Sequence, residues 1–279
     1  MPAPASPTPI LTSFANPRVK AVTALRDRRE RDRTGLTLID GARELRRALE
    51  AGADVVEAFV CEPLLAGVDA RAALDLLHAR GVATQSTSEA VFAKLAFGER
   101  AEGLLAVVRI RTVGLDDLAL PADPLVAVIE AVEKPGNVGA VLRSADGAGV
   151  DAVVAASPRT DLFNPNAIRA SAGTMFTVPV AAAPTPEVLD WLRGKGLRIV
   201  AARVDAERLY TEADLTGPLA LVLGAEAEGL TDAWTADDIE AVRLPMLGVA
   251  DSLNVSVSAA ILLYEARRQR GLPTDSAKE

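Results

Sequence analysis

Short, wholly apolar runs in the second half of the chain most constrain its fold. Strands are expected at 125–132, 151–156, 178–182, 197–202, 219–223 and 241–245, helices at 137–148, 166–172 and 186–195, and a short helix after Gly229. Because these strands do not alternate apolar with polar residues, both faces of their sheet should be covered, as in parallel sheets. Ligands of such sheets bind at the carboxyl ends of the strands. Gly136, Gly224 and Gly248 fall at these ends.

The first 111 residues predict a smaller α/β domain. A helix is expected at 16–33, with Asn16 as its cap and Pro17 at its first position. Strands at 36–39, 55–60, 82–84 and 103–109 alternate with helices at 41–51, 69–80 and 88–95. The predicted division is a disordered tail 1–12, a domain 13–111, an aperiodic linker 112–124 with two prolines, a domain 125–272 and a tail 273–279.

Residues 242–270 predict a strand that ends at Leu244-Pro245-Met246, then a loop and a long helix. Ser252 is the candidate N-cap of this helix. Arginines in its last turn, followed by Gly271, are typical of a helix C-terminus. The segment could be a well-capped helix and nothing more. Its polar start could also present donors to a ligand. Its apolar residues are Val257, Ala260, Ile261, Leu263 and Tyr264.

Composition excludes several classes of protein. Cys61 is the only cysteine, which rules out an internal disulfide and a cysteine-based metal cluster. His78 is the only histidine, which argues against histidine-dependent catalysis and histidine-rich metal sites. No stretch reaches the roughly 18 apolar residues of a membrane span. The N-terminus has neither the basic start nor the apolar run of a signal peptide. We therefore expect a cytoplasmic protein that binds no metal and does not associate with a membrane.

Charge is unevenly distributed along the chain, whose net charge is −8. Residues 1–111 carry 16 Lys and Arg against 14 Asp and Glu, whereas residues 112–279 carry 14 against 24. Within 14–47, ten basic residues face five acidic ones. This stretch could be a phosphate-binding patch. It could equally be a solvated helix face in which acidic residues neutralise the arginines.

Three segments, in order, resemble the SpoU (TrmH-like) class of the SPOUT superfamily. Residues 137–145 (NVGAVLRSA) match N-x-G-x-x-x-R-(S/T)-A, and residues 223–230 (LGAEAEGL) match L-G-x-E-x-x-G-L. The third segment is Leu244-Pro245-Met246 with 252–256 (SLNVS). Residues 163–173 look like the family's phosphate-contacting segment, and 16–20 and 38–41 resemble a ribosomal-protein-like RNA-binding domain. Ala225 and Asp251 depart from the Asn and Glu of many members, which bears on substrate choice.

The resemblance implies an S-adenosylmethionine-dependent RNA ribose 2′-O-methyltransferase. Its fold would be α/β, with a parallel-sheet C-terminal domain that contains a deep trefoil knot within 219–270, and it would act as a homodimer. Ribosomal RNA, 23S in particular, is the expected substrate. Transfer RNA and a non-catalytic RNA-binding protein remain alternatives. A generic nucleotide-binding oxidoreductase is a third alternative, but no G-x-G-x-x-G follows a strand.

The resemblance also nominates site residues. The catalytic set is Asn137, Arg143, Glu226, Ser252 and Asn254. A guanidinium stays protonated, so we expect Arg143 to stabilise the developing 2′-alkoxide and grip a phosphate rather than act as a base. A helix-surface ion pair is the alternative role for Arg143, and a structural role is open for Glu226. The cofactor set is Ala201, Ala202, Leu223, Gly224, Gly229, Leu244, Met246 and Leu253, and the RNA-binding set is Arg18, Lys20, Arg28, Arg29, Arg169 and Ser171. Arg169 is the candidate phosphate clamp, or else a surface charge.

Overall fold

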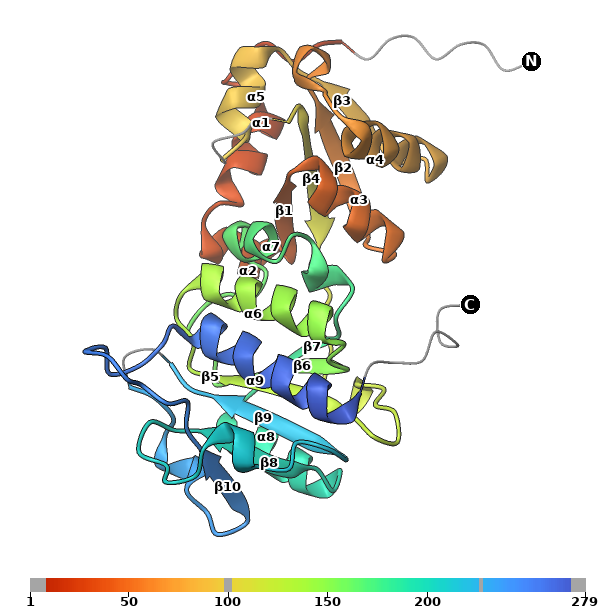
Figure 1. The fold of residues 1–279 in the computed structure, drawn as a ribbon. Coiled ribbons are helices and arrows are strands. Elements are labelled where there is room, and N and C mark those ends of the chain that lie inside the picture. Colours follow the sequence, from red (N-terminus) through yellow and green to blue (C-terminus); the bar gives the residue numbers. More distant parts are fainter. Residues whose placement is uncertain (1–8, 98–101, 226–227, 272–279) are drawn as a thin grey trace. The chain divides into compact units, whose positions relative to one another are not determined.

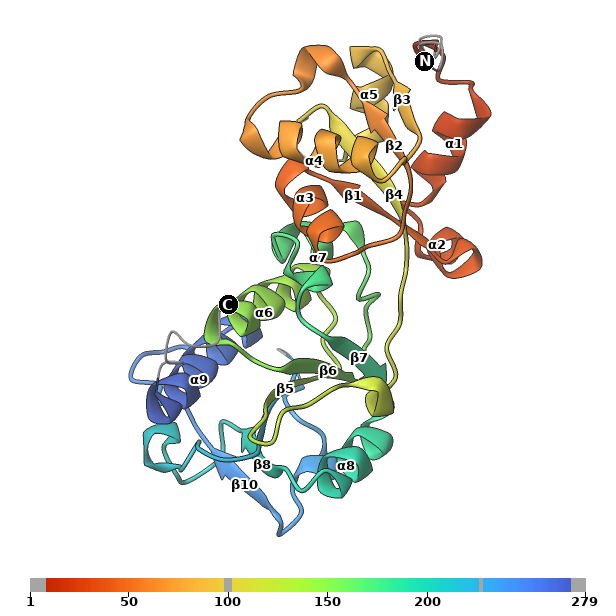
Figure 2. The same cartoon turned by 90° about the vertical axis from the view of Figure 1, so that its right-hand side faces the viewer.

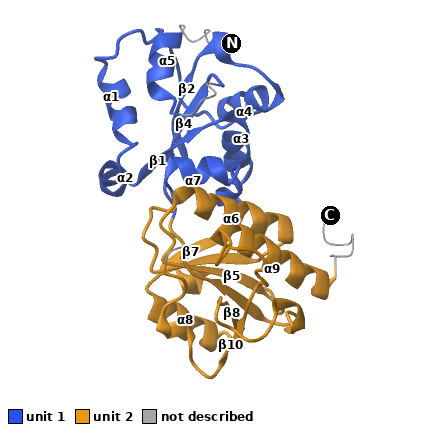
Figure 3. Cartoon of the chain, turned by 60° about the vertical axis from the view of Figure 1, so that its left-hand side comes forward, with its two compact units in different colours: residues 1–111, 163–177 blue, residues 112–162, 178–279 orange. Residues whose placement is uncertain are grey.

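A computed structural model describes residues 9–97, 102–225 and 228–271 of the chain. The chain forms two compact units (Figure 3). Unit 1 comprises residues 1–111 and 163–177, and unit 2 comprises residues 112–162 and 178–279. Among the described residues, no helix is long and apolar enough to cross a bilayer.

Unit 2 is built on a six-stranded sheet whose strands are all parallel (Figure 1). The strand order is β10-β8-β9-β5-β6-β7. Every residue of β5, β6 and β9 is buried, so the expectation of a parallel sheet covered on both faces is confirmed. The strands are β5 (Leu125–Glu130), β6 (Ala152–Ala156), β7 (Val180–Ala183), β8 (Arg198–Ala202), β9 (Leu219–Leu223) and β10 (Ile239–Val242).

Helices cover the two faces of this sheet. Helices α6 (Pro135–Ala148) and α9 (Val255–Arg270) pack side by side on one face, and α8 (Thr185–Gly194) lies on the other (Figure 2). The first two run parallel, because contacts join both their starts and their ends. Near the starts, Asn254 Nδ2 donates to Asn137 Oδ1 at 3.3 Å, and near the ends, Arg267 Nε donates to the Ala148 carbonyl at 2.7 Å.

Two sequence predictions about the approach to α9 are wrong. The last strand ends at Val242 rather than at Leu244-Pro245-Met246, because Arg243 pairs with residues 208–210 and no longer with β8. The N-cap of α9 is Asn254 rather than Ser252: its Oδ1 accepts from the Ser256 backbone N–H at 2.9 Å. The helix ends at Arg270 before Gly271, as predicted.

Arg270 anchors the end of α9. Its side chain is only 8% exposed and donates to the carbonyls of Asp123 and Pro124 at 3.1 Å, Leu215 at 3.2 Å, and Gly217. Burial lowers the pKa of Arg270 from its usual value. The guanidinium thus joins the last helix to the segments that lead into β5 and β9.

Unit 1 contains a four-stranded sheet in the order β1-β4-β2-β3. Strand β4 is antiparallel to both its neighbours, and β3 is parallel to β2. The elements are β1 (Leu36–Asp40), α3 (Ala42–Glu50), β2 (Val55–Val60), α4 (Val68–Ala79), β3 (Thr84–Ser86), α5 (Glu89–Leu95) and β4 (Leu104–Arg109).

The helix expected at 16–33 is in fact two helices, α1 (Pro17–Ala24) and α2 (Arg28–Thr34). Asp27 caps the second by accepting from the Arg29 N–H at 2.9 Å. The buried Arg31 donates to the carbonyls of Leu25 and Arg26, both at 2.8 Å. An internal cap and a buried cation that satisfies carbonyls beyond α1 therefore favour the break.

Residues 163–177, which the sequence analysis placed in the second domain, belong to unit 1. They include α7 (Pro165–Ala170), which contacts β1. Thr37 Oγ1 donates to the Phe163 carbonyl at 2.6 Å, and Arg47 Nη1 donates to the Ala172 carbonyl at 2.8 Å. Sequence periodicity could not reveal this placement, because these partners are more than a hundred residues apart.

Replacing Arg270 with Met should lower the free energy of unfolding by about 1–3 kcal/mol, because buried carbonyls lose their donor. Equilibrium denaturation measures this change. Arg268→Met is the control: Arg268 is 70% exposed and contacts Glu265, so its loss should cost at most about 1 kcal/mol. Equal losses in the two variants would contradict an anchoring role for Arg270.

Candidate active site

A pocket of about 420 Å³ lies at the carboxyl ends of β8, β9 and β10 in unit 2. Its walls are the segments that follow these strands and the first residues of α9. The structure brings together seven of the eight predicted cofactor residues there: Ala202, Leu223, Gly224, Gly229, Leu244, Met246 and Leu253. Ala201, the eighth, is fully buried within β8 and does not line the pocket.

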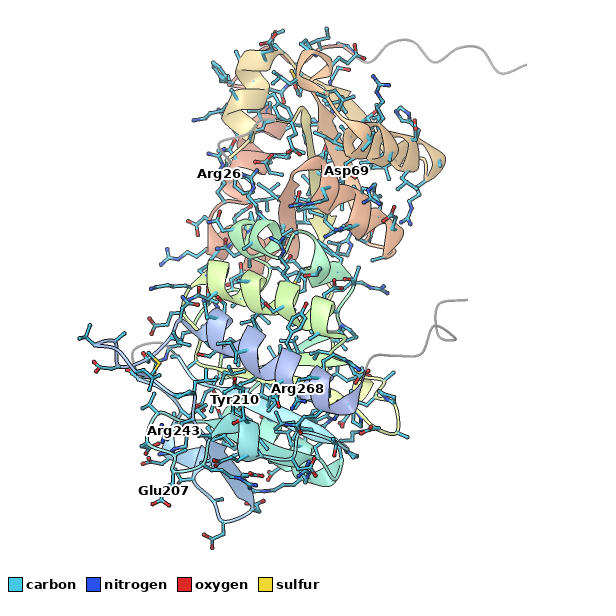
Figure 4. The ribbon with its side chains drawn as sticks, in the orientation of Figure 1. Arg26, Asp69, Glu207, Tyr210, Arg243 and Arg268 are labelled. Atoms are coloured by element: carbon cyan, nitrogen blue, oxygen red, sulfur yellow. The ribbon has the colours of Figure 1, made fainter. Side chains whose placement is uncertain are left out.

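The sequence analysis missed the pocket wall that follows β8. Arg203, Val204 and Asp205 line the pocket, and Arg203 forms a two-pronged ion pair with Asp205 at 2.9 Å. The segment that continues from them pairs with the end of β10: the Tyr210 N–H donates to the Arg243 carbonyl at 3.1 Å (Figure 4). Their position directly after a strand of the parallel sheet is the signal that could have found these residues.

The glycine-containing wall of the pocket is a tight backbone crossing. The Gly229 N–H donates to the Ala225 carbonyl at 3.0 Å, which folds the chain back over the end of β9. A Cβ at Gly224 would overlap the backbone of Gly229 and Leu230. Position 224 therefore excludes every side chain. Glu226, a predicted catalytic residue in the same loop, lies outside the described residues.

Asn137 and Asn254 bring together two predicted motifs that lie 117 residues apart in the sequence. Asn254 both caps α9 and donates to Asn137 at 3.3 Å. The Asn137 Nδ2 atom is buried and has no acceptor among the residues that the structure describes. Ser252, two residues before the cap, lines the pocket. The joined helix starts thus place amide donors near the pocket wall.

Arg143 lies on α6, exposed to solvent. Within the described parts of the chain its guanidinium has neither a hydrogen bond nor an ion pair. The structure thus offers no support for the alternative that Arg143 serves a helix-surface ion pair. A cation without an internal partner remains able to bind an anionic substrate.

Arg159 connects two segments of this region and was not predicted. Its Nη1 atom contacts Glu133 at 2.9 Å and its Nη2 atom contacts Glu228, a pocket residue, at 2.6 Å. The hydrogen bond to Glu228 raises the pKa of Arg159, and the bond to Glu133 adds to this. The guanidinium thus bridges the loop after β5 and the glycine-containing wall.

Most predicted RNA-binding residues of unit 1 have internal partners. Arg18 contacts Glu57 at 2.6 Å and Arg28 contacts Asp32 at 3.5 Å. Lys20 and Arg29 are exposed and have no side-chain partner among the residues described. The charge of the 14–47 stretch is therefore partly neutralised within the unit.

The two candidates from segment 163–177 also make internal contacts. Arg169 Nη2 donates to the buried Asp40 carboxylate at 3.1 Å. The Arg169 guanidinium also lies over the ring of Phe97, with Cζ 5.6 Å from the ring centroid. Ser171 is fully buried, and its Oγ donates to the Ile168 carbonyl at 2.7 Å. Direct RNA contact by Ser171 is therefore at odds with this structure, whereas Arg169 is still one third exposed.

Comparisons with known proteins identify the family. The model of the SpoU rRNA Methylase family matches residues 124–264. The chain belongs to this family. The model of the MRM3-like substrate binding domain matches residues 16–106. The resemblance noted in the sequence is thus confirmed, and the first matched region lies mainly in unit 2.

Individual relatives agree with this assignment. The chain is 32% identical over 255 residues to the 23S rRNA (uridine(2479)-2′-O)-methyltransferase of Streptomyces viridochromogenes, covering 88% of this chain and 87% of that one. It resembles a crystal structure of an RNA 2′-O ribose methyltransferase, with 45% identity, a TM-score of 0.82 and coverage of 94% and 99%. An AdoMet-bound rRNA methyltransferase from Sinorhizobium meliloti gives 27% identity, a TM-score of 0.84 and coverage of 94% and 98%.

Replacing Gly224 with Ala should abolish binding of S-adenosylmethionine, because the new Cβ would displace the Gly229–Leu230 wall of the pocket. Isothermal titration calorimetry measures the binding. The matched control is Gly248→Ala, since a Cβ at Gly248 meets no atom within 4 Å. Unchanged affinity in the Gly224 variant would show that this wall does not shape the cofactor site.

Proposed function

We propose that this protein transfers a methyl group from S-adenosylmethionine to a ribose 2′-hydroxyl of 23S ribosomal RNA. The observation that carries the proposal is the pocket at the strand ends, which is lined by residues of two family motifs. The Asn137–Asn254 contact joins the remaining motif, residues 137–145, to them. A relative named as a 23S rRNA 2′-O-methyltransferase and an AdoMet-bound neighbour support both substrate and cofactor.

The pocket suits this cofactor in size and in chemistry. Its volume of about 420 Å³ is within the usual range for small-molecule sites. Leu223, Leu244 and Met246 offer an apolar wall, while Asp205, Glu228 and Asp251 place carboxylates around it. Asp205 pairs with Arg203 and Glu228 with Arg159, so the lining keeps a modest negative charge and favours a ligand with an apolar body and a net positive charge. S-adenosylmethionine carries both and supplies an activated methyl group on its sulfonium.

Asn137, Asn254 and Arg143 would position and stabilise the ribose hydroxyl. Asn254 fixes the orientation of the Asn137 amide, whose Nδ2 donor has no acceptor among the described residues and would hold an acceptor of the substrate once uncovered. Arg143 would stabilise the negative charge that develops on the 2′-oxygen as its proton passes to solvent water, since a guanidinium cannot accept that proton. Ser252 and Glu226 complete the proposed catalytic set. Catalysis would rest on orientation and electrostatics.

Residues 13–111, together with 163–177 of the same unit, would bind the RNA, and the rest of 125–272 would carry the reaction, with 112–124 as the linker. The match of the substrate binding domain model to residues 16–106 supports this division. We further propose the deep trefoil knot within 219–270 and a cytoplasmic location. The backbone crossing at Gly224 and the return of α9 onto α6 are compatible with the knot. Transfer RNA as substrate and a non-catalytic role are less well supported, because the named relative modifies 23S rRNA.

Replacing Arg143 with Ala should abolish methylation while leaving stability within about 0.5 kcal/mol of the wild type. Transfer of labelled methyl groups to ribosomal RNA, followed by mapping of 2′-O-methyl positions, measures the activity. Lys195→Ala removes an exposed cation at the end of α8 and serves as the control. Retained turnover in the Arg143 variant would refute its role. If wild-type protein labels no ribose in either ribosomal or transfer RNA, the proposed activity is wrong.

Lys20 and Arg29 should carry part of the RNA affinity, since they are exposed and have no internal partner among the described residues. Replacing both with Ala should weaken RNA binding and reduce the slope of log affinity against log salt by roughly 1.5 to 2. Arg109→Ala is the control, because Arg109 already pairs with Asp54 at 3.0 Å. A wild-type salt slope in the double variant would show that residues 14–47 form a solvated helix face and not a phosphate-binding patch.

We also propose a homodimer that pairs through α9 and α6. Val257 and Tyr264 are 46% and 54% exposed on α9, and Leu247 and Val249 of the preceding loop are almost fully exposed. Leu263, another apolar residue of this helix, is fully buried inside unit 2 and is therefore not available for such a contact. A self-complementary contact would cover these apolar side chains.

Changing Val257 and Tyr264 to Glu should give a folded monomer, because two charges per chain would have to be buried in the contact. Sedimentation velocity measures the mass, and methyl transfer is assayed in parallel. Val68→Glu is the control, since Val68 is an apolar residue of unit 1 that is even more exposed than Val257 and Tyr264. A wild-type protein that sediments as a monomer would overturn the dimer, and a fully active monomeric variant would show that the site is complete in one chain.

A further inference from the structure

Glu130, the last residue of β5, is a buried acid that the motifs do not explain. Glu130 is only 1% exposed, and no Lys or Arg among the described residues forms an ion pair with it. Three donors contact its carboxylate. Thr185 Oγ1 and Thr231 Oγ1 donate to Oε1 at 2.8 and 2.9 Å, and the Thr231 N–H donates to Oε2 at 2.8 Å. Because burying a carboxyl group is costly, these contacts should serve a structural or functional purpose.

The contact with Thr231 closes the glycine-containing wall of the pocket. Strand β5 pairs with β9 up to Ile129 and Leu223, so Glu130 lies beside the point where the chain leaves the sheet at Gly224. Thr231 directly follows Gly229 and Leu230, which line the pocket. The sheet therefore holds the beginning of this loop, and Glu130 holds its end.

The contact with Thr185 faces a different part of unit 2. The Thr185 N–H and hydroxyl contact Ser157 Oγ at 2.9 and 3.0 Å, and Ser157 has a left-handed φ of 44°. Neither Thr185 nor Ser157 lines the pocket. One carboxylate thus joins a segment of the pocket wall to a segment remote from the pocket.

We propose that Glu130 is a positioning residue for methyl transfer, which holds Thr231 and through it sets the Gly229–Leu230 wall against the cofactor. Glu130 does not line the pocket and is buried, so it acts through Thr231 and does not exchange protons with the substrate. This inference rests on the assignment of the pocket to S-adenosylmethionine.

Single substitutions on the two sides of Glu130 test the inference. Thr231→Val removes the hydroxyl donor and preserves the side-chain shape. It should raise the dissociation constant for S-adenosylmethionine and the KM for this cofactor about tenfold, with kcat at saturating cofactor changed less than about twofold. Thr231→Ser, which keeps the hydroxyl, should restore the affinity. Thr185→Val removes the other hydroxyl contact to Glu130 Oε1 and should lower the melting temperature without changing the dissociation constant.

Calorimetry and thermal unfolding of the full-length variants distinguish the outcomes. Wild-type affinity in Thr231→Val, or an equal loss of affinity in Thr185→Val, would overturn the positioning role. A loss confined to Thr231→Val and reversed by Thr231→Ser would establish it. Failure of the wild-type protein to bind S-adenosylmethionine would instead refute the assignment of the pocket, and thus the function on which this inference rests.

Discussion

The parallel contact of α9 with α6, over one face of a fully buried sheet, is the interaction on which the candidate site depends. It brings Asn254 to Asn137 and thereby joins residues 117 positions apart in the sequence. The same contact places Leu253 and Val255 against the loops that leave the sheet, where they line the pocket. Both helix starts lie together, so the positive ends of their dipoles also lie together, which suits an anionic substrate.

Close approach of backbone segments defines the pocket as much as its side chains do. Gly224 admits no Cβ because the chain crosses directly over it, and Glu130 ties down the crossing segment through Thr231. Arg159 braces the same wall from outside through exposed ion pairs, which solvent weakens. A buried, charge-assisted contact and an exposed one thus support the same loop, and the buried one should contribute more.

Cations in unit 1 illustrate how tertiary structure redirects charge. Arg26 and Arg31, both counted in the basic stretch, donate to backbone carbonyls of the protein. Arg169 contacts the buried Asp40, so segment 163–177 is held within unit 1 by an interaction that no local sequence pattern predicts. Counting charges along a chain therefore overstates the number that a nucleic acid can contact. The several N–H donors of a long arginine side chain can be occupied by carbonyls and carboxylates of the protein itself.

By itself the sequence determined the family, the parallel α/β character of unit 2 and seven of the residues around the pocket. These follow from local signals: apolar strands, glycines and short motifs. Only the tertiary structure decided that Asn254 caps α9, that Leu263 and Ser171 are buried, and that residues 163–177 join unit 1. It also revealed the contacts of Glu130 with Thr185 and Thr231. Apart from the Asn254 cap, which accepts from the Ser256 N–H two residues away, each of these depends on partners distant in sequence. No local pattern encodes which distant group will satisfy a buried donor or acceptor.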